Sequence, residues 1–254
     1  MNKPKATNFS SDAGSPVKTQ TMKIIGILSG SGPSAGAAIE NDMLHYLQNK
    51  YKAVDDLDYP DYILYNKPLR GFWVTWIERP DLVEEDFVNA MKKLNNMGAE
   101  VIGIACNTLH ELLSKVEKDL DARVINMIHE TCKQTKELDN ILVLCSESTT
   151  KSAMYENYLK DTMKKQKVRT LHWEYQKQVD EVIEAAMWWT QSQEHKDIIN
   201  KIIEYYQSQW TVDAVILWCT ELPLAYSQED HTLPVISSNQ TLAQTLVEAA
   251  KDNY

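Results

Sequence analysis

Two cysteines occupy equivalent places in two stretches that share one pattern of residue types. In residues 101–110, an apolar run ends at Cys106 and continues into an amide and a hydroxyl side chain. In residues 214–221, a similar run ends at Cys219 and continues into a hydroxyl and a carboxyl side chain. Each pattern predicts a buried strand that delivers a thiol to the start of a helix. A thiolate at a helix N-terminus has a lowered pKa and can act as a base or a nucleophile.

Two thiols that face one cleft can invert a stereocentre without any cofactor. One thiolate takes a proton from carbon, and the other thiol returns a proton to the opposite face. The alternative for any single cysteine is a small buried hydrophobic side chain. We apply that alternative to Cys132, which falls inside a predicted helix, and to Cys145, which has no matched partner. The paired placement of Cys106 and Cys219 instead favours catalysis.

The elements that must position these cysteines also recur along the chain. Short apolar segments look alike in all parallel α/β chains. Here, however, three segments of the first half match three of the second half, in the same order and at nearly the same separation in sequence, which indicates a repeat. The pairs are 23–29 with 140–146, 101–108 with 214–221, and 123–126 with 233–237. We therefore expect an α/β fold with two similar Rossmann-like domains, each built from a parallel sheet and crossover helices.

The predicted domains follow from this repeat. Residues 1–21 are polar and rich in Ser, Thr, Lys and Pro, which predicts a disordered N-terminal extension. The first α/β domain is assigned residues 22–128 plus 238–254, because the final helix is expected to pack back on the first half. Residues 129–237 form the second.

The predicted elements alternate as the fold class requires. A glycine turn follows the first strand, and Asp81 and Gly98 are expected to cap the second helix. The strands are predicted at 23–28, 61–66, 101–105, 124–127, 141–145, 168–173 and 214–218. The helices are predicted at 34–47, 81–98, 109–120, 129–138, 151–164, 178–209 and 240–251.

Composition excludes several classes of function. The net charge of −10 argues against binding to nucleic acid, which needs a basic surface. No apolar run approaches the ~20 residues of a membrane span, and the N-terminus lacks a secretory signal pattern. The 4 cysteines show no CxxC spacing, so we expect neither zinc nor a disulfide framework, but reduced thiols in the cytoplasm. The loose glycine pattern at Gly30, Gly32 and Gly36 has the wrong spacing for a dinucleotide, so no cofactor is expected.

Over about residues 22–250 the chain resembles the aspartate/glutamate racemase superfamily, and within it the aspartate racemase branch. The paired Cys-Asn-Thr and Cys-Thr-Glu motifs carry most of this resemblance. The matching segments are 25–33, 65–68, 105–110, 127–131 and 219–221. The resemblance implies two α/β domains related by a pseudo-twofold axis, with an active site between them. It also implies cofactor-independent racemisation of an amino acid by two thiols, and a homodimer.

The resemblance also assigns roles to individual residues. Cys106 and Cys219 become the pair that acts as base and acid. The remaining substrate-binding residues belong to loops at strand ends. They are Ser31, Asn66, Arg70, Asn107, Thr108, Ser146, Ser148, Thr149, Thr220 and Glu221. Hydrogen bonds from such groups to the substrate carboxylate stabilise carbanion character at Cα, which the weakly acidic α-proton demands.

The chain departs from the family where an acidic substrate side chain would be held. Trp73 stands at the position of a family arginine, with Arg70 shifted along the chain, and Trp188 stands near a family lysine. Glu147 adds a negative charge. Either Arg70 reaches the pocket and the substrate remains aspartate or glutamate, or the tryptophans line an altered pocket for a neutral, aromatic or cationic side chain. We predict an amino-acid racemase with a weakened preference for aspartate.

Other functions remain open at this stage. Within the superfamily they are hydantoin racemisation, maleate-type isomerisation and arylmalonate decarboxylation. From other classes they are a non-catalytic two-domain small-molecule binder and a thiol redox sensor.

Overall fold

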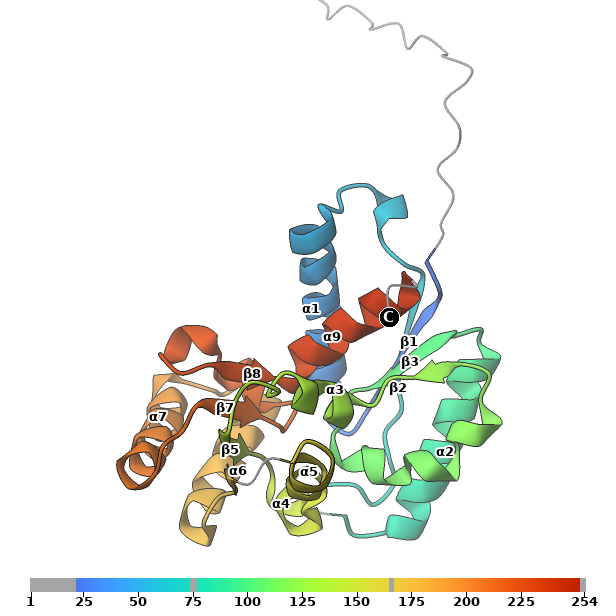
Figure 1. Ribbon diagram of the computed structural model, residues 1–254. Coiled ribbons are helices and arrows are strands. Elements are labelled where there is room, and N and C mark those ends of the chain that lie inside the picture. Colours follow the sequence, from blue (N-terminus) through green and yellow to red (C-terminus); the bar gives the residue numbers. More distant parts are fainter. Residues whose placement is uncertain (1–21, 74–76, 165–166, 252–254) are drawn as a thin grey trace, which may run out of the picture.

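Two four-stranded parallel sheets organise the chain, as Figure 1 shows for the computed structural model. The structure describes residues 22–73, 77–164 and 167–251, so the predicted extension over 1–21 lies outside the described residues. The first sheet has the order β2-β1-β3-β4. Its strands are β1 (Ile25–Ser29), β2 (Tyr62–Asn66), β3 (Val101–Ile104) and β4 (Arg123–Val124). The second sheet has the order β6-β5-β7-β8. Its strands are β5 (Asn140–Leu144), β6 (Lys167–Arg169), β7 (Ala214–Leu217) and β8 (Val235–Ser237).

The two sheets repeat one topology. In each, the first strand along the chain lies between the second and the third, and the fourth pairs with the third. The central strands β1, β3 and β7 are fully buried, because their helices cover both faces of the sheet. The predicted α/β class with two similar parallel-sheet units is confirmed.

Helices connect the parallel strands in both halves. In the first half these are α1 (Pro33–Tyr51), α2 (Pro80–Asn96) and α3 (Met127–Lys133), with short 3₁₀ segments η1 (Asp56–Asp58), η2 (Thr108–Lys115) and η3 (Glu117–Asp119). In the second half these are α4 (Glu147–Ser152), α5 (Met154–Asn157), α6 (Trp173–Met187), α7 (Gln193–Gln209), α8 (Leu222–Ala225) and α9 (Ser238–Ala250), with a π-helical turn η4 (Tyr158–Thr162) and a 3₁₀ turn η5 (Gln228–Asp230).

Several predicted boundaries were wrong. The segment predicted as one helix over 109–120 forms two 3₁₀ segments, η2 and η3. The region 178–209 forms two helices, because Ser192 starts α7 with a reciprocal capping box. Helix α2 begins at Pro80, a favoured first helical position, so Arg79 and not Asp81 is its N-cap. Helix α4 begins directly after β5, whereas the helix was predicted from residue 151.

The last helix lies against the first half of the chain. Figure 1 shows α9, in red, crossing beside α1, in blue. Leu242 and Leu246 pack so closely over β3 that a Cβ on Gly103 would meet Leu246 at 2.9 Å. Glu248 accepts hydrogen bonds from Tyr46 and Tyr51 of α1, at 2.8 and 2.7 Å. The predicted return of the C-terminal helix is therefore observed, while the domain bounds stay a prediction.

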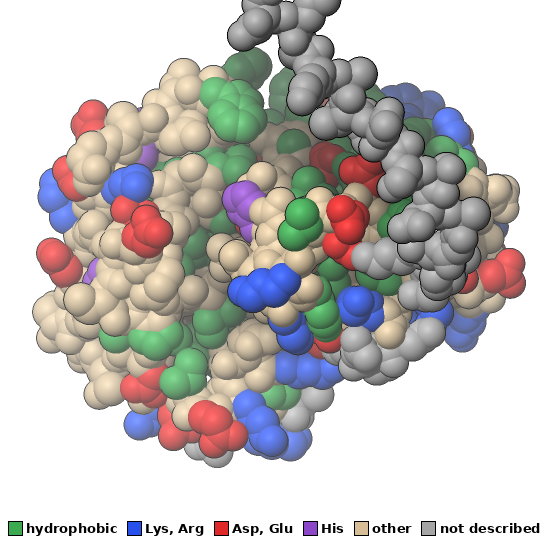
Figure 2. Space-filling view, turned by 90° about the horizontal axis from the view of Figure 1, so that it is seen from above, with side chains coloured by type: hydrophobic (Ala, Val, Ile, Leu, Met, Phe, Trp, Pro, Cys, Tyr) green, Lys and Arg blue, Asp and Glu red, His purple; other side chains and the backbone are tan. Residues whose placement is uncertain are grey.

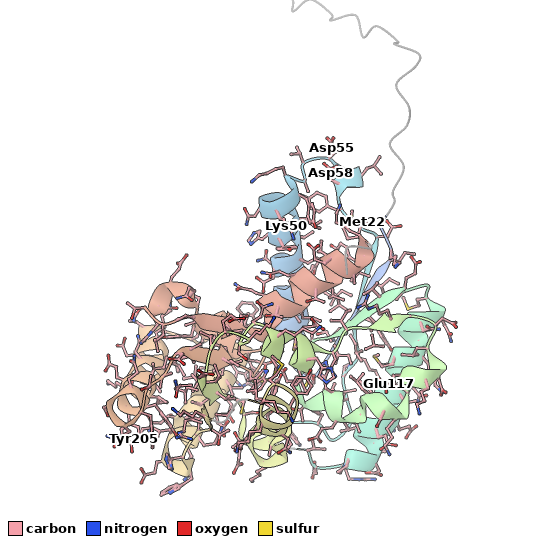
Figure 3. All side chains as sticks on the ribbon, in the orientation of Figure 1. Met22, Lys50, Asp55, Asp58, Glu117 and Tyr205 are labelled. Carbon is pink, nitrogen blue, oxygen red and sulfur yellow. The ribbon has the colours of Figure 1, made fainter. Side chains whose placement is uncertain are left out.

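Charges of both signs cover the surface. Acidic and basic side chains are interspersed on the face in Figure 2. Figure 3 places Lys50 near the end of α1, beside the turn that carries Asp55 and Asp58. The Asp58 carboxylate accepts hydrogen bonds from the backbone amides of Val54 and Asp55, both at 3.0 Å, and so holds this turn. Within the described part of the chain, the helices are too short or too polar to cross a bilayer.

Candidate active site

Equivalent strand ends deliver the two cysteines to one cavity. Cys106 lies two residues beyond β3, and Cys219 lies two residues beyond β7. Both side chains are buried and line the same narrow cavity, which spans about 260 Å³ of space between atoms, part of it open to solvent. Because β3 and β7 hold the same place in their sheets, the repeat itself brings the thiols together.

Most of the predicted site residues gather around this cavity. They come from both halves, from the loop after β1 and from the segments after β3, β5 and β7. The predicted residues that line it are Ser31, Cys106, Asn107, Thr108, Ser146, Thr149, Cys219, Thr220 and Glu221. Polar groups at the carboxyl ends of parallel strands meet at one edge of a sheet, which explains the grouping.

Hydroxyl groups connect the two halves across the cavity. The Thr108 and Thr149 hydroxyl oxygens are 3.1 Å apart, and either can donate the proton. Ser146 lies 3.1 Å from the hydroxyls of both Thr149 and Ser148. Ser148 thus belongs to the network without lining the cavity. Rotating hydroxyls can turn their protons toward an incoming carboxylate, so the network suits an anionic group.

The Asn107 amide fixes the loop after β3 against the second half. Its Nδ2 donates to the carbonyl of Trp218 and, at 3.3 Å, to the hydroxyl of Ser238. Its Oδ1 accepts a hydrogen bond from the Tyr155 hydroxyl. All four side chains are buried. Asn107 therefore holds Cys106 next to the segment that carries Cys219.

Glu221 brings a buried carboxyl to the cavity. Its Oε2 accepts hydrogen bonds from the Cys219 thiol and the Thr220 hydroxyl, both at 3.0 Å. Its Oε1 is buried without a partner among the described residues, and a Cβ added at Gly32 would come within 2.1 Å of it. Burial raises the pKa of Glu221 above its usual value. An unpaired carboxyl oxygen of this kind suits a ligand that donates hydrogen bonds.

Burial raises the pKa values of both thiols. Burial raises the pKa of Cys106 to about 11, although the nearby Ser31 hydroxyl favours the thiolate. Ser31 influences the thiol without meeting the geometry of a full hydrogen bond. Burial and the Glu221 carboxylate raise the pKa of Cys219 well above its usual value. The expectation of thiols with lowered pKa values was wrong for this state, because desolvation outweighs the local donors.

Comparison with known proteins assigns this arrangement to a family. A sequence model of the Asp/Glu/hydantoin racemase family matches residues 31–246. The chain belongs to this family. The broad specificity amino-acid racemase of Bacillus subtilis (strain 168) is 27% identical over 228 residues, which cover 88% of this chain and 96% of that protein.

Solved structures of racemases share the fold. The aspartate racemase of Picrophilus torridus has a TM-score of 0.74 and 27% identity, covering 90% of this chain and 94% of that chain. An aspartate racemase homologue from Pyrococcus horikoshii has a TM-score of 0.75 and 25% identity, covering 91% and 100%. The predicted family and the predicted class of enzyme, an isomerase, are confirmed.

The raised thiol pKa values give the first prediction for this racemase. Without substrate, alkylation of Cys106 and Cys219 by iodoacetamide is expected to speed up about tenfold per pH unit from pH 7 to 10, because the thiolate fraction rises tenfold per unit below the pKa. Mass spectrometry of the two peptides measures both rates, and N-acetylcysteine is the control for the reagent. A plateau below pH 9 at either cysteine would contradict the assignment.

The structure does not bring Arg70 to the cavity. Its guanidinium forms a bidentate pair with the Asp86 carboxylate, at 2.9 and 3.0 Å, and a further contact with Glu85 at 3.2 Å. The Arg70 amide also donates to Asp86, so the residue anchors its loop to α2. This pairing holds the pKa of Asp86 well below its usual value.

Four further predicted residues also lie away from the cavity. Trp73 and Trp188 are 57% and 76% exposed, so both indoles face solvent. Glu147 pairs with Lys151 on the surface of α4 at 2.9 Å. Asn66 is exposed at the end of β2. None of them is among the described residues that line the cavity with the thiols.

Sequence reasoning missed several residues that shape the site. Phe72 and Trp218 line the cavity, and Tyr155 and Ser238 hold Asn107. The sequence-based prediction placed Trp73 in the side-chain pocket, but the residue that lines the cavity is its neighbour Phe72. Trp218 directly precedes Cys219, as Ala105 precedes Cys106, and this difference between the repeats was the available signal.

His110 is buried and neutral beneath the first cysteine. Its Nδ1 lies 2.9 Å from the Cys106 carbonyl, and its Nε2 accepts a hydrogen bond from the Met127 amide at 3.1 Å. With Nε2 as acceptor, Nδ1 carries the proton and donates to the carbonyl. Burial lowers the pKa of His110 to about 4. The side chain therefore supports the loop backbone and does not contact the thiol.

This burial predicts a pH dependence of stability. Between pH 6.5 and 4 the unfolded chain binds a proton at His110, whereas the folded chain does not. The free energy of unfolding is therefore expected to decrease by about 3 kcal/mol as the pH is lowered through this range. Urea unfolding of wild type and His110→Gln between pH 4 and 7 measures this as a difference in slope. Equal slopes in wild type and His110→Gln would refute the assignment.

Proposed function

We propose that this protein racemises amino acids with Cys106 and Cys219 as its two acid–base groups, and that its substrates are not strictly acidic. One observation carries the proposal: both thiols line one cavity from equivalent strand ends of two repeated halves. Family membership and the broad-specificity relative support the same reading.

The polar groups of the cavity can hold both charged ends of an amino acid. The unpaired Oε1 of Glu221 can accept a hydrogen bond from the substrate ammonium. The hydroxyls of Thr108, Ser146 and Thr149 can donate to the carboxylate. This binding leaves Cα between the two sulfur atoms. Hydrogen bonds to the carboxylate strengthen as carbanion character develops and so lower the barrier to proton removal.

Substrate binding also changes the state of the thiols. Burial and the Glu221 carboxylate oppose a thiolate at Cys219, but a substrate ammonium beside Glu221 would neutralise that carboxylate and favour thiolate formation. The thiol proton leaves to solvent. The thiolate on one face then removes the α-proton, and the thiol on the other face gives its proton to Cα. The product has inverted configuration, and the two sulfurs have exchanged protonation states.

The lining of the cavity supports a substrate that is not strictly acidic. Among the described lining residues there is no lysine or arginine, and Phe72 and Trp218 supply apolar surface. A carboxylate side chain buried there would lack a cationic partner, which costs free energy. Small neutral or apolar side chains avoid this cost.

Turnover across a substrate panel tests the proposal. Circular dichroism would follow L-aspartate, L-glutamate, L-alanine, L-methionine, L-phenylalanine and L-lysine, with a 5-substituted hydantoin as the other substrate class of the family. We expect racemisation of neutral amino acids with kcat/KM at least about tenfold above that for aspartate.

Two results would decide against parts of the proposal. Aspartate as clearly the best substrate would refute the altered specificity, and hydantoin turnover alone would refute the amino-acid assignment. In deuterated water, each turnover should place one deuteron at Cα. Release of carbon dioxide would instead indicate decarboxylation.

We also propose a cytoplasmic homodimer. All four cysteines are free and buried, which is compatible with a reducing compartment. Analytical ultracentrifugation of the full chain checks the oligomeric state, and a concentration-independent monomer mass would refute the dimer.

A further inference from the structure

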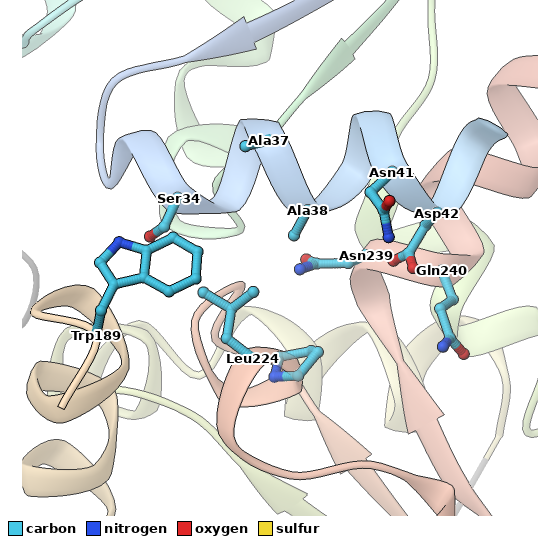
Figure 4. A pocket seen from close by; sticks show the side chains of 10 residues that line it. Ser34, Ala37, Ala38, Asn41, Asp42, Trp189, Leu224, Asn239 and Gln240 are labelled. Atoms are coloured by element: carbon cyan, nitrogen blue, oxygen red, sulfur yellow. The ribbon is translucent and has the colours of Figure 1, made fainter. Parts of the chain in front are cut away.

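A second pocket lies between the two halves, beside helix α8, which follows the segment that carries Cys219. Its walls are α1, α8, the start of α9 and Trp189 from the loop between α6 and α7, as Figure 4 shows. It encloses about 700 Å³ of empty space, part of it open to solvent. Among the described residues, its lining has no member in common with that of the cavity that holds the thiols.

Buried polar atoms without partners line this pocket. Asn239 is fully buried, and its Oδ1 has no partner among the described residues, while Figure 4 shows its amide pointing into the space between α1 and Leu224. The Ser34 hydroxyl is also buried and unpartnered, and it lies beside the Trp189 indole in the same view. Buried polar atoms are hydrogen-bonded in most proteins, so two such atoms without a protein partner in one pocket favour the binding of a polar ligand there.

The charge and shape of the pocket define the ligand class. Asp42 is the one charged side chain among the described lining residues. Burial raises the pKa of Asp42 to about 6, and the nearby His45 acts in the opposite direction, so the carboxyl is ionised at neutral pH. Pro223 and Leu224 supply apolar surface, and the Trp189 indole lies at the opposite end of the pocket from Asp42, beside Ser34. The carboxylate and the amide oxygen both accept hydrogen bonds, which suits an ammonium group, and the apolar wall suits an apolar body. We propose that this pocket binds a small organic ammonium ion with an apolar body.

The pocket also has a physical link to the catalytic segment. Asn239 uses its Nδ2 to donate a 2.8 Å hydrogen bond to the Thr220 carbonyl, between Cys219 and Glu221. Pro223 and Leu224, on the next turn, form the pocket wall. A ligand that engages Asn239 Oδ1 would therefore hold the amide that positions Thr220.

Calorimetric titration of the full chain with phenethylammonium tests the proposal. We expect saturable binding to one site, at least about tenfold tighter than that of 2-phenylethanol, which has the same body without the charge. Binding of the anion 3-phenylpropionate should be absent. Asp42→Asn is expected to weaken phenethylammonium binding about tenfold. Glu40→Gln, on the same helix but outside the pocket, should leave it unchanged.

Hydrogen exchange locates the ligand independently of the variants. Added protection in residues 34–42 and 222–225, without a change in 104–108, supports the proposal, because a ligand in the thiol cavity would protect 104–108. The proposal fails if binding is not saturable at about 10 mM. It also fails if Cys219→Ser abolishes binding while Asp42→Asn does not, since the ligand then occupies the catalytic cavity. The racemase assignment is unaffected by either failure.

Discussion

Replacement of either Cys106 or Cys219 by serine is expected to lower racemisation at least about 1,000-fold, because a hydroxyl is a far weaker acid than a thiol and cannot serve as the base. Both variants should fail, since inversion needs a group on each face of Cα. Circular dichroism with the best substrate of the panel measures the loss. The substitution is nearly isosteric, so thermal unfolding should change little.

The same variants should retain chemistry on one face. With a β-chloro amino acid, a single thiolate can remove the α-proton and expel chloride, so each variant should eliminate from only one enantiomer. Cys145→Ser is the matched control, because Cys145 also ends a strand and bonds to the Thr150 hydroxyl but does not line the cavity. Racemisation by either single variant at more than a tenth of the wild-type rate would refute the two-thiol mechanism.

Gly32→Ala is expected to lower activity about 100-fold or more and the free energy of unfolding by about 2–4 kcal/mol. Gly32 has φ of 112°, which L side chains rarely adopt, and its new Cβ would lie 2.1 Å from Glu221 Oε1. The Glu221 carboxyl would have to leave its place beside Cys219. Steady-state kinetics and urea unfolding measure the two effects.

Gly98→Ala is a control that separates the effect of backbone strain from the effect of displacing the Glu221 carboxyl group. Gly98 has φ of 96°, but a Cβ there would meet only Ile24, at 4.0 Å. Gly98→Ala should therefore cost about 1 kcal/mol and leave kcat/KM unchanged. If Gly32→Ala kept wild-type activity despite lost stability, the proposed role of Glu221 in binding the ammonium would be wrong.

The strand ends were predictable because they carry two independent signals. The apolar runs before Cys106 and Cys219 identify buried strands, and the repeat places both thiols at the same edge of equivalent sheets. That placement needed no knowledge of side-chain packing. It also grouped Thr108, Ser146 and Thr149, since each follows a central strand.

Other features of the candidate site depend on tertiary interactions that no local sequence pattern reveals. Arg70 is held by Asp86, which lies sixteen positions later on α2, so its distance from the cavity follows from tertiary pairing. Phe72 lines the cavity whereas Trp73 is exposed, and this difference between neighbours depends on the path of the chain after the turn at Gly71. The thiol pKa values follow from burial, which the helix-terminus argument ignored. The 3₁₀ form of the segment after Cys106 likewise gave no recognisable signal.

The packing of α9 has a consequence for synthesis on the ribosome. Leu242 and Leu246 of α9 complete the core around Ile25 and Ile27 of β1, although more than two hundred residues separate the two elements in the sequence. During synthesis, the apolar side chains of β1 that α9 covers are made long before Leu242 and Leu246. The final packing of the first sheet can therefore form only after α9 has been translated, and until then this part of the chain exposes apolar surface.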